Sequence, residues 1–96
     1  MVKHIVCFKI KEEYKNRINE AKKTLLSMKG NVPMLKGIEV GVDFLHSGRS
    51  YDIILMVDLE DEVQLDLYQH DDYHCNVVKK LMHSIVDTSI AVDYKY

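Results

Sequence analysis

The chain has 96 residues, of which 47% are apolar and 29% are charged, and this length and composition are typical of one globular domain. Its formal net charge of −2 provides no basic face for the phosphates of nucleic acid or for anionic lipid, so we expect neither as a partner. No stretch approaches the roughly 18 uncharged residues of a membrane helix, and Lys3, His4 and Lys9 interrupt the apolar start of the chain as no signal peptide would, so we expect a cytoplasmic protein.

The first two predicted elements are a strand over residues 2–10 and a helix over residues 12–29. Both faces of the strand are largely apolar, which predicts that it is covered on both sides. The helix has one apolar stripe at steps of three and four residues, whose members are Tyr14, Ile18, Ala21, Leu25 and Met28. Gly30 can adopt the left-handed conformation that ends a helix, and Pro33 prevents its continuation.

Two further strands are predicted over residues 36–45 and 50–59, with a turn around Gly48 between them. The first of the two alternates, and its apolar side is formed by Ile38, Val40, Val42 and Phe44. The second contains the unbroken apolar run IILMV, which is typical of an interior strand covered on both faces.

The last third of the chain predicts two helical segments and a fourth strand over residues 88–95. Asp61 is a suitable N-cap for the first segment, whose apolar side chains are Val63, Leu67 and Tyr68. The second segment carries Val77, Val78, Leu81, Met82 and Ile85. The order β-α-β-β-α-β predicts an α+β, ferredoxin-like fold with helices on a four-stranded antiparallel sheet, in a single domain over residues 1–96.

The strands carry more apolar surface than one layer of helices can cover. Helices lie on one face of such a sheet, yet the opposite parity is apolar as well, at Ile5, Cys7, Ile54, Met56, Ile90 and Val92. A second copy of the chain, packed sheet against sheet, would bury both faces and gain the free energy of burying apolar surface. We therefore predict a homodimer.

The segment YQHDDYHCNV, between the two helical segments, concentrates titratable side chains. His70 and His74 are four apart, as in the H-E-x-x-H zinc motif, but that motif needs a continuous helix and a third ligand at a familiar spacing. We predict neither here, and therefore no metal site. Asp71 and Asp72 are interpreted as the residues that start the second helical segment. Cys75 is interpreted as an unreactive thiol, and both cysteines of the chain are expected to be free.

Histidine and tyrosine side chains suit acid/base chemistry or the binding of a polar ligand group. A histidine titrates near pH 6.5, and a tyrosine hydroxyl can hold the carbonyl oxygen of a substrate. His4 comes from a strand, whereas Tyr68 and His74 come from a helical corner, so the three can converge between sheet and helices. The alternative is that the histidines satisfy backbone groups and Tyr68 only fills the core.

Several segments of the chain resemble the stress-responsive A/B barrel family, also called Dabb. They are VKHIVCFKIKEE, MKGNVPMLKGIEVGVDF, SGRSYDIILMVDLED, LYQHDDYH and VDYKY, in the order of the family and over almost the whole chain. GVDFLHSGRSYD is the most specific of the matching stretches. The resemblance implies a ferredoxin-like protomer and a homodimer whose two sheets close into a barrel.

The family includes a plant polyketide cyclase whose chemistry needs no metal or organic cofactor. The resemblance implies that its functional residues are matched here by His4, Tyr68 and His74, with Tyr68 and His74 as the catalytic pair. Asp71 and Asp72 stand where the family usually has a His-Pro pair.

Three functions are compatible with these observations. The first is a homodimer that binds a small, partly apolar molecule through His4, Tyr68 and His74, without a cofactor. The second is a cofactor-independent, polyketide-cyclase-like enzyme that uses histidine and tyrosine for acid/base chemistry. The third is a non-catalytic dimer with a structural role under stress.

Overall fold

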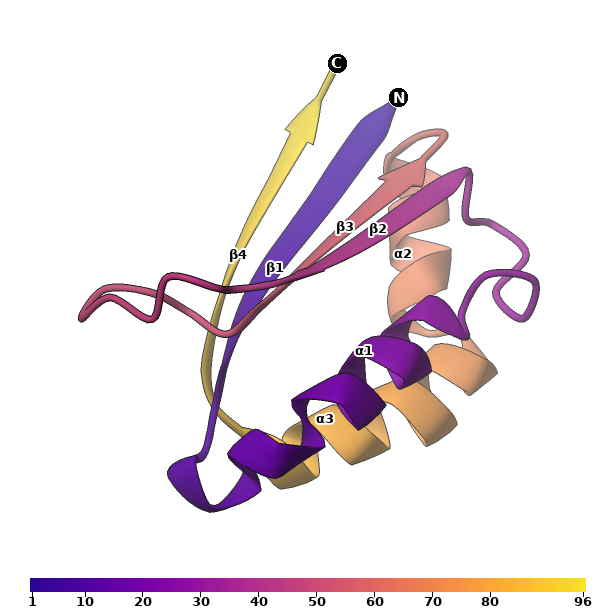
Figure 1. The fold of residues 1–96 in the computed structure, drawn as a ribbon. Helices are drawn as coiled ribbons and strands as arrows, with labels where there is room; N and C mark the ends of the chain where they lie inside the picture. Colours follow the sequence, from indigo (N-terminus) through magenta and orange to yellow (C-terminus); the bar gives the residue numbers. More distant parts are fainter.

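Four strands form one antiparallel sheet in the order β2-β3-β1-β4 in the computed structural model, which describes residues 1–96 (Figure 1). The strands are β1 Val2–Ile10, β2 Gly37–Val42, β3 Ile53–Leu59 and β4 Val86–Lys95. The helices are a 3-10 helix Glu12–Arg17, α1 Ile18–Leu26, α2 Glu62–Gln69, a π-helix His74–Lys79 and α3 Lys80–Ile85. This element order and sheet topology confirm the ferredoxin-like prediction.

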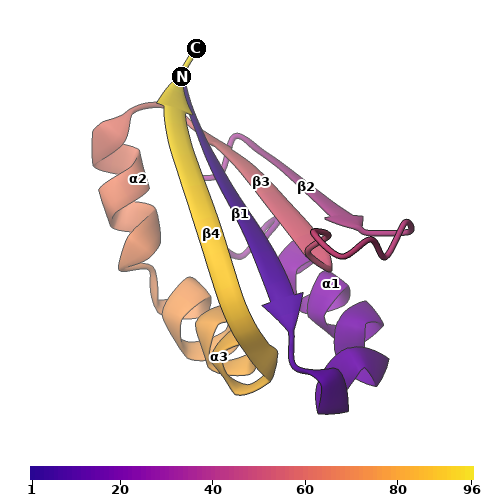
Figure 2. The same ribbon diagram turned by 90° about the vertical axis from the view of Figure 1, so that its left-hand side faces the viewer.

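All of the helices lie on one face of the sheet (Figure 2). The core fills the space between them and that face, and its fully buried side chains include Ile10, Leu25, Met28, Ile53, Val57, Leu59, Tyr68 and Ile85. The two central strands, β1 and β3, supply much of this core because alternate residues of a strand point to the same side. None of the helices is long and apolar enough to cross a membrane.

The helix predicted over residues 12–29 is shorter and irregular. Its first turn is 3-10 rather than α-helical, where the Lys15 ammonium donates a hydrogen bond of 2.9 Å to the buried carboxylate of Asp52, directly before β3. The α-helix ends at Leu26, and Gly30 has a φ of +87°, the left-handed conformation expected of it. The predicted apolar stripe is correct nevertheless, since its last three members are completely buried.

Two predicted apolar faces are only partly correct. The side chains of Val63 and Leu67 on α2 are 65% and 48% exposed, while Tyr68 on the same helix is fully buried. The helix turns a single edge to the sheet, so an apolar residue one step off that edge meets solvent. Strand β2 ends at Val42, so Phe44 lies outside the sheet and is 87% exposed. Asp61 caps α2 as predicted, because its carboxylate accepts the Gln64 N–H at 2.9 Å.

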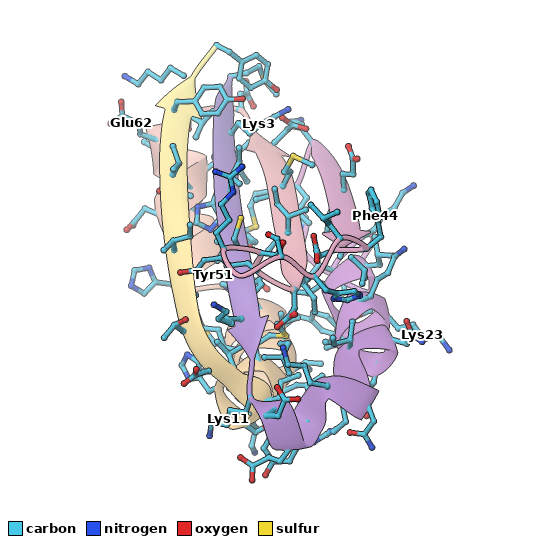
Figure 3. The ribbon with its side chains drawn as sticks, turned by 60° about the vertical axis from the view of Figure 1, so that its left-hand side comes forward. Lys3, Lys11, Lys23, Phe44, Tyr51 and Glu62 are labelled. Carbon is cyan, nitrogen blue, oxygen red and sulfur yellow. The ribbon has the colours of Figure 1, made fainter.

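The face of the sheet away from the helices, the open face, is also apolar. Its two central rows, in register across four strands, are Ile90, Cys7, Ile54 and Gly41, and Val92, Ile5, Met56 and Glu39. Figure 3 looks toward this face, and the loop between β2 and β3, with Tyr51, crosses in front of it. No helix covers these rows, and Ile90 and Val92 are more than half exposed.

Candidate functional site

The side chains of His4, Tyr68 and His74 meet between the sheet and the C-terminal end of α2. His4 lies in the middle of β1, Tyr68 in the last turn of α2, and His74 at the start of the π-helix. The rings of Tyr68 and His74 are stacked with their centroids 4.3 Å apart, and the His4 ring meets Tyr68 edge-on at 5.7 Å. All three residues are at least nine-tenths buried.

Asp71 shapes the corner that brings His74 onto Tyr68. Its carboxylate accepts the backbone N–H of His74 at 3.0 Å, and its carbonyl accepts the N–H of Cys75 at 2.8 Å. This is the arrangement of a helix N-cap, so the helical path ends after Gln69 and restarts with its first turn fixed. Asp71 at this corner is therefore compatible with close approach of the two rings.

The His74 imidazole is neutral at pH 7. Burial lowers its pKa to about 4, and the positive charge of Lys79 acts in the same direction, while a hydrogen bond to the Tyr68 carbonyl opposes them. In this hydrogen bond Nδ1–H donates to the carbonyl oxygen at 3.1 Å. The proton of the neutral ring therefore sits on Nδ1, which leaves Nε2 as an acceptor.

The Tyr68 hydroxyl is directed into the core. It contacts the sulfur of Met28 at 3.8 Å, and burial raises the pKa of the hydroxyl above its ordinary value. The hydroxyl is therefore protonated at any physiological pH, with a weak acceptor as its partner. What Tyr68 presents to His74 is the face of its ring rather than its oxygen.

Asp93 on β4 is a member of the site that sequence reasoning missed. Its carboxylate accepts a hydrogen bond from Nδ1 of His4, the residue directly opposite it in the β1–β4 ladder. A carboxylate on Nδ1 fixes the orientation and tautomer of an imidazole and leaves Nε2 for other partners. The one signal in the sequence was an acidic residue directly after the apolar run of residues 90–92, and it becomes informative only when the register is known.

His4, Tyr68 and His74 line a cavity of about 250 Å³ between the sheet and the α2–α3 segment. Nine of its fifteen lining residues are hydrophobic, among them Val6, Phe8, Leu55 and Met82. The Nε2 atoms of His4 and of His74 make no hydrogen bond. Every side-chain nitrogen or oxygen that is hidden from solvent does make one, so these two atoms are not hidden. Both nitrogens are therefore accessible from the cavity, whose remaining polar lining comes from Gln69, Lys79, His83 and Ser89.

The other titratable residues of the segment YQHDDYHCNV, residues 68–77, lie outside this cavity. His70 is exposed, and its Nδ1 bonds to the Asp66 carbonyl at 2.9 Å. No three His, Cys, Asp or Glu side chains are placed to hold a metal ion. Cys75 and Cys7 are both free, and the Cys75 thiol donates to the Gln69 carbonyl at 3.4 Å.

Solved structures of low sequence identity share this fold. A dimeric ferredoxin-like protein of unknown function from Bacteroides fragilis is 23% identical, with a TM-score of 0.85 over 99% of this chain and 95% of that one. A second dimeric ferredoxin-like protein, from Thermobifida fusca, is 20% identical, with a TM-score of 0.85 over 99% and 90% of the two chains. An antibiotic biosynthesis monooxygenase is 16% identical, with a TM-score of 0.78 over 100% and 98%.

At these identities the likeness establishes the fold alone. A search of curated protein sequences finds no significant match. The model of one protein family, described as the stress responsive A/B barrel domain or Dabb, matches residues 2–96. This match covers nearly the whole chain, including β1, α2 and β4, which carry the site. The chain therefore belongs to the Dabb family.

Proposed function

We propose that the protein is a homodimer in which each protomer binds a small, partly apolar molecule in the cavity beside His4, Tyr68 and His74. The observation that carries this proposal is the cavity itself, which is mostly apolar and open to solvent, with two accessible imidazole nitrogens. Its volume of about 250 Å³ lies just below the roughly 300 to 1,000 Å³ of sites for drug-sized ligands. A smaller molecule with one or two polar groups fits these dimensions.

The dimer is supported by the open face. Ile5, Ile54 and Met56 stand at the centre of two apolar rows that no helix covers, and two of the similar structures are described as dimeric. Packing two open faces together would bury both sets of rows. The dimer should give a mass near twice the chain mass of 11.2 kDa in light scattering coupled to size exclusion.

The Ile54→Asp variant should shift this mass toward the monomer, because an unpaired charge buried in the interface costs several kcal/mol. Val63→Asp is the matched control, since Val63 is an exposed apolar residue of α2 on the other side of the sheet. A wild type that remains monomeric at micromolar concentration would contradict the proposed assembly.

Ligand binding can be tested with the protein as purified. Native mass spectrometry followed by extraction should detect a small molecule in the wild type. Ala91→Phe should lose it, because Ala91 lines the cavity from β4 and a phenyl ring would occupy the space. Val63→Phe adds the same ring away from the cavity and should retain the ligand. An intact wild-type dimer with no small molecule, either in the native mass spectrum or after extraction, would favour the purely structural role.

A cofactor-independent enzyme is the second candidate, supported by the position of His74, which lines the cavity with its Nε2 free of hydrogen bonds. An acceptor Nε2 facing an apolar cavity can take a proton from a carbon next to a carbonyl group and return it. Exchange of such protons of 4-phenylbutan-2-one in D₂O, followed by NMR, tests this step. His74→Gln should slow the catalysed exchange by a factor of about 10² to 10⁴, whereas a wild type no faster than buffer would exclude catalysis on this substrate class.

A further inference from the structure

The lining of the cavity has an unbalanced charge. Lys79 is its only permanently charged side chain, and no Asp or Glu is among the fifteen lining residues. Two carboxylates that contact the site histidines are engaged within the chain: Asp71 accepts the N–H of His74, and Asp93 accepts from the His4 ring. The cavity therefore presents one cation and no anion of its own.

The Lys79 ammonium has no ionic partner in the chain. Its Nζ contacts only the carbonyl oxygen of Gln69, at 3.4 Å, in a partly buried position. Only Lys3, Lys15 and Lys95 have a carboxylate within 3.4 Å, and Lys79 differs from the other unpaired lysines because it alone lines the cavity. A partly desolvated ammonium with one long hydrogen bond retains donors for a further acceptor, and a charged acceptor gives the stronger bond.

The π-helix places Lys79 beside His74. In an α-helix, residues five apart point about 140° away from each other, as 3.6 residues per turn requires. In a π-helix, backbone hydrogen bonds join residues i and i+5, so such residues come to the same side. His74 and Lys79 are the first and last residues of this segment, and both line the cavity. The effect of the Lys79 charge on the pKa of His74 reflects the same proximity.

From this geometry we propose that the ligand is a small monocarboxylate with an apolar body, and that Lys79 is the residue that selects its negative charge. The carboxylate lies at the mouth of the cavity against the Lys79 ammonium, and the apolar body lies against Val6, Leu55 and Met82. One cation compensates one negative charge, which favours a carboxylate over a phosphate dianion. This inference rests on the proposed ligand-binding function and specifies its ligand class.

Matched pairs of probes that differ only in charge test the inference. The pairs are benzoate and benzamide, 3-phenylpropionate and 3-phenylpropionamide, and hexanoate and hexanamide, each titrated into the dimer and followed by amide chemical shifts. The wild type should bind the carboxylate of at least one pair about tenfold or more tightly than the amide, as a charge-assisted hydrogen bond provides. Lys79→Met keeps an unbranched side chain of similar length without the charge and should bring the two affinities to within about twofold.

Lys80→Met is the control, because it removes the same charge from an exposed neighbour that does not line the cavity. It should keep the preference of the wild type. Equal binding of acid and amide by the wild type would overturn the anionic ligand and leave the binding function standing. A preference that survives in Lys79→Met would overturn the role of Lys79. If no probe of any pair binds the wild type, the inference fails together with the binding function.

Discussion

Acidification should destabilise the fold through His74. The folded-state pKa is about 4 and the ordinary value is 6.5. Above pH 6.5 the imidazole is neutral in both states and contributes no pH dependence. Between pH 6.5 and 4 the unfolded chain binds a proton that the folded chain does not, so the free energy of unfolding falls as the pH falls. The gap between the two values corresponds to about 3 kcal/mol in full, and to about 2 kcal/mol at pH 5.

The comparison of wild type with His74→Gln isolates this contribution. Urea unfolding at pH 7.5 and pH 5.0, at one fixed protein concentration because the assembly is proposed to be dimeric, gives the two free energies for each protein. The wild type should lose about 2 kcal/mol more than the variant between these conditions. His83→Gln is the control, since His83 is an exposed histidine of the same cavity. Equal pH dependence in wild type and His74→Gln would refute the reasoning.

Three further substitutions test local features of the fold. Asp61→Ala removes the N-cap of α2 and should lower the free energy of unfolding by about 1 kcal/mol, with exposed Asp66→Ala near zero as its control. Gly30→Ala should lower the free energy of unfolding by about 1 to 2 kcal/mol, because φ is +87° there, although a Cβ atom would meet no neighbour. An unchanged midpoint of thermal unfolding would contradict this. Tyr68→Phe should cost less than about 1 kcal/mol, since the hydroxyl meets only the Met28 sulfur, and a larger loss in urea would indicate an additional partner.

The sheet and its helical layer were predictable because their signals are local. Alternation along β1 and β3, the Asp61 cap and the Gly30 turn each depend on a few neighbouring residues. The secondary-structure predictions were wrong where tertiary contacts determine the local conformation. The ion pair of Lys15 with Asp52 holds the start of the first helix in a tighter turn, and this contact joins residues 37 positions apart.

The site was predictable only in part for the same reason. His4, Tyr68 and His74 were identified through residue type and family resemblance, and the structure brings them together, while their roles stay predictions. Asp93 can be assigned to the site only when the β1–β4 register is known. Lys79 can be assigned to the site only when the π-helix is known, because α-helical periodicity would turn its side chain away from His74.

The position of β1 in the centre of the sheet has a consequence for biosynthesis. Both of its neighbours follow it in the chain, and its contact with β4 joins His4 to Asp93, 89 residues later. Pairings of such long separation form slowly compared with local helices and hairpins. Until β4 has left the ribosome, the strand β1, which contains Ile5 and Cys7, therefore keeps one edge unpaired. The proposed ligand would stabilise the protein only after β4 has docked, because Ser89 and Ala91 of β4 line the cavity.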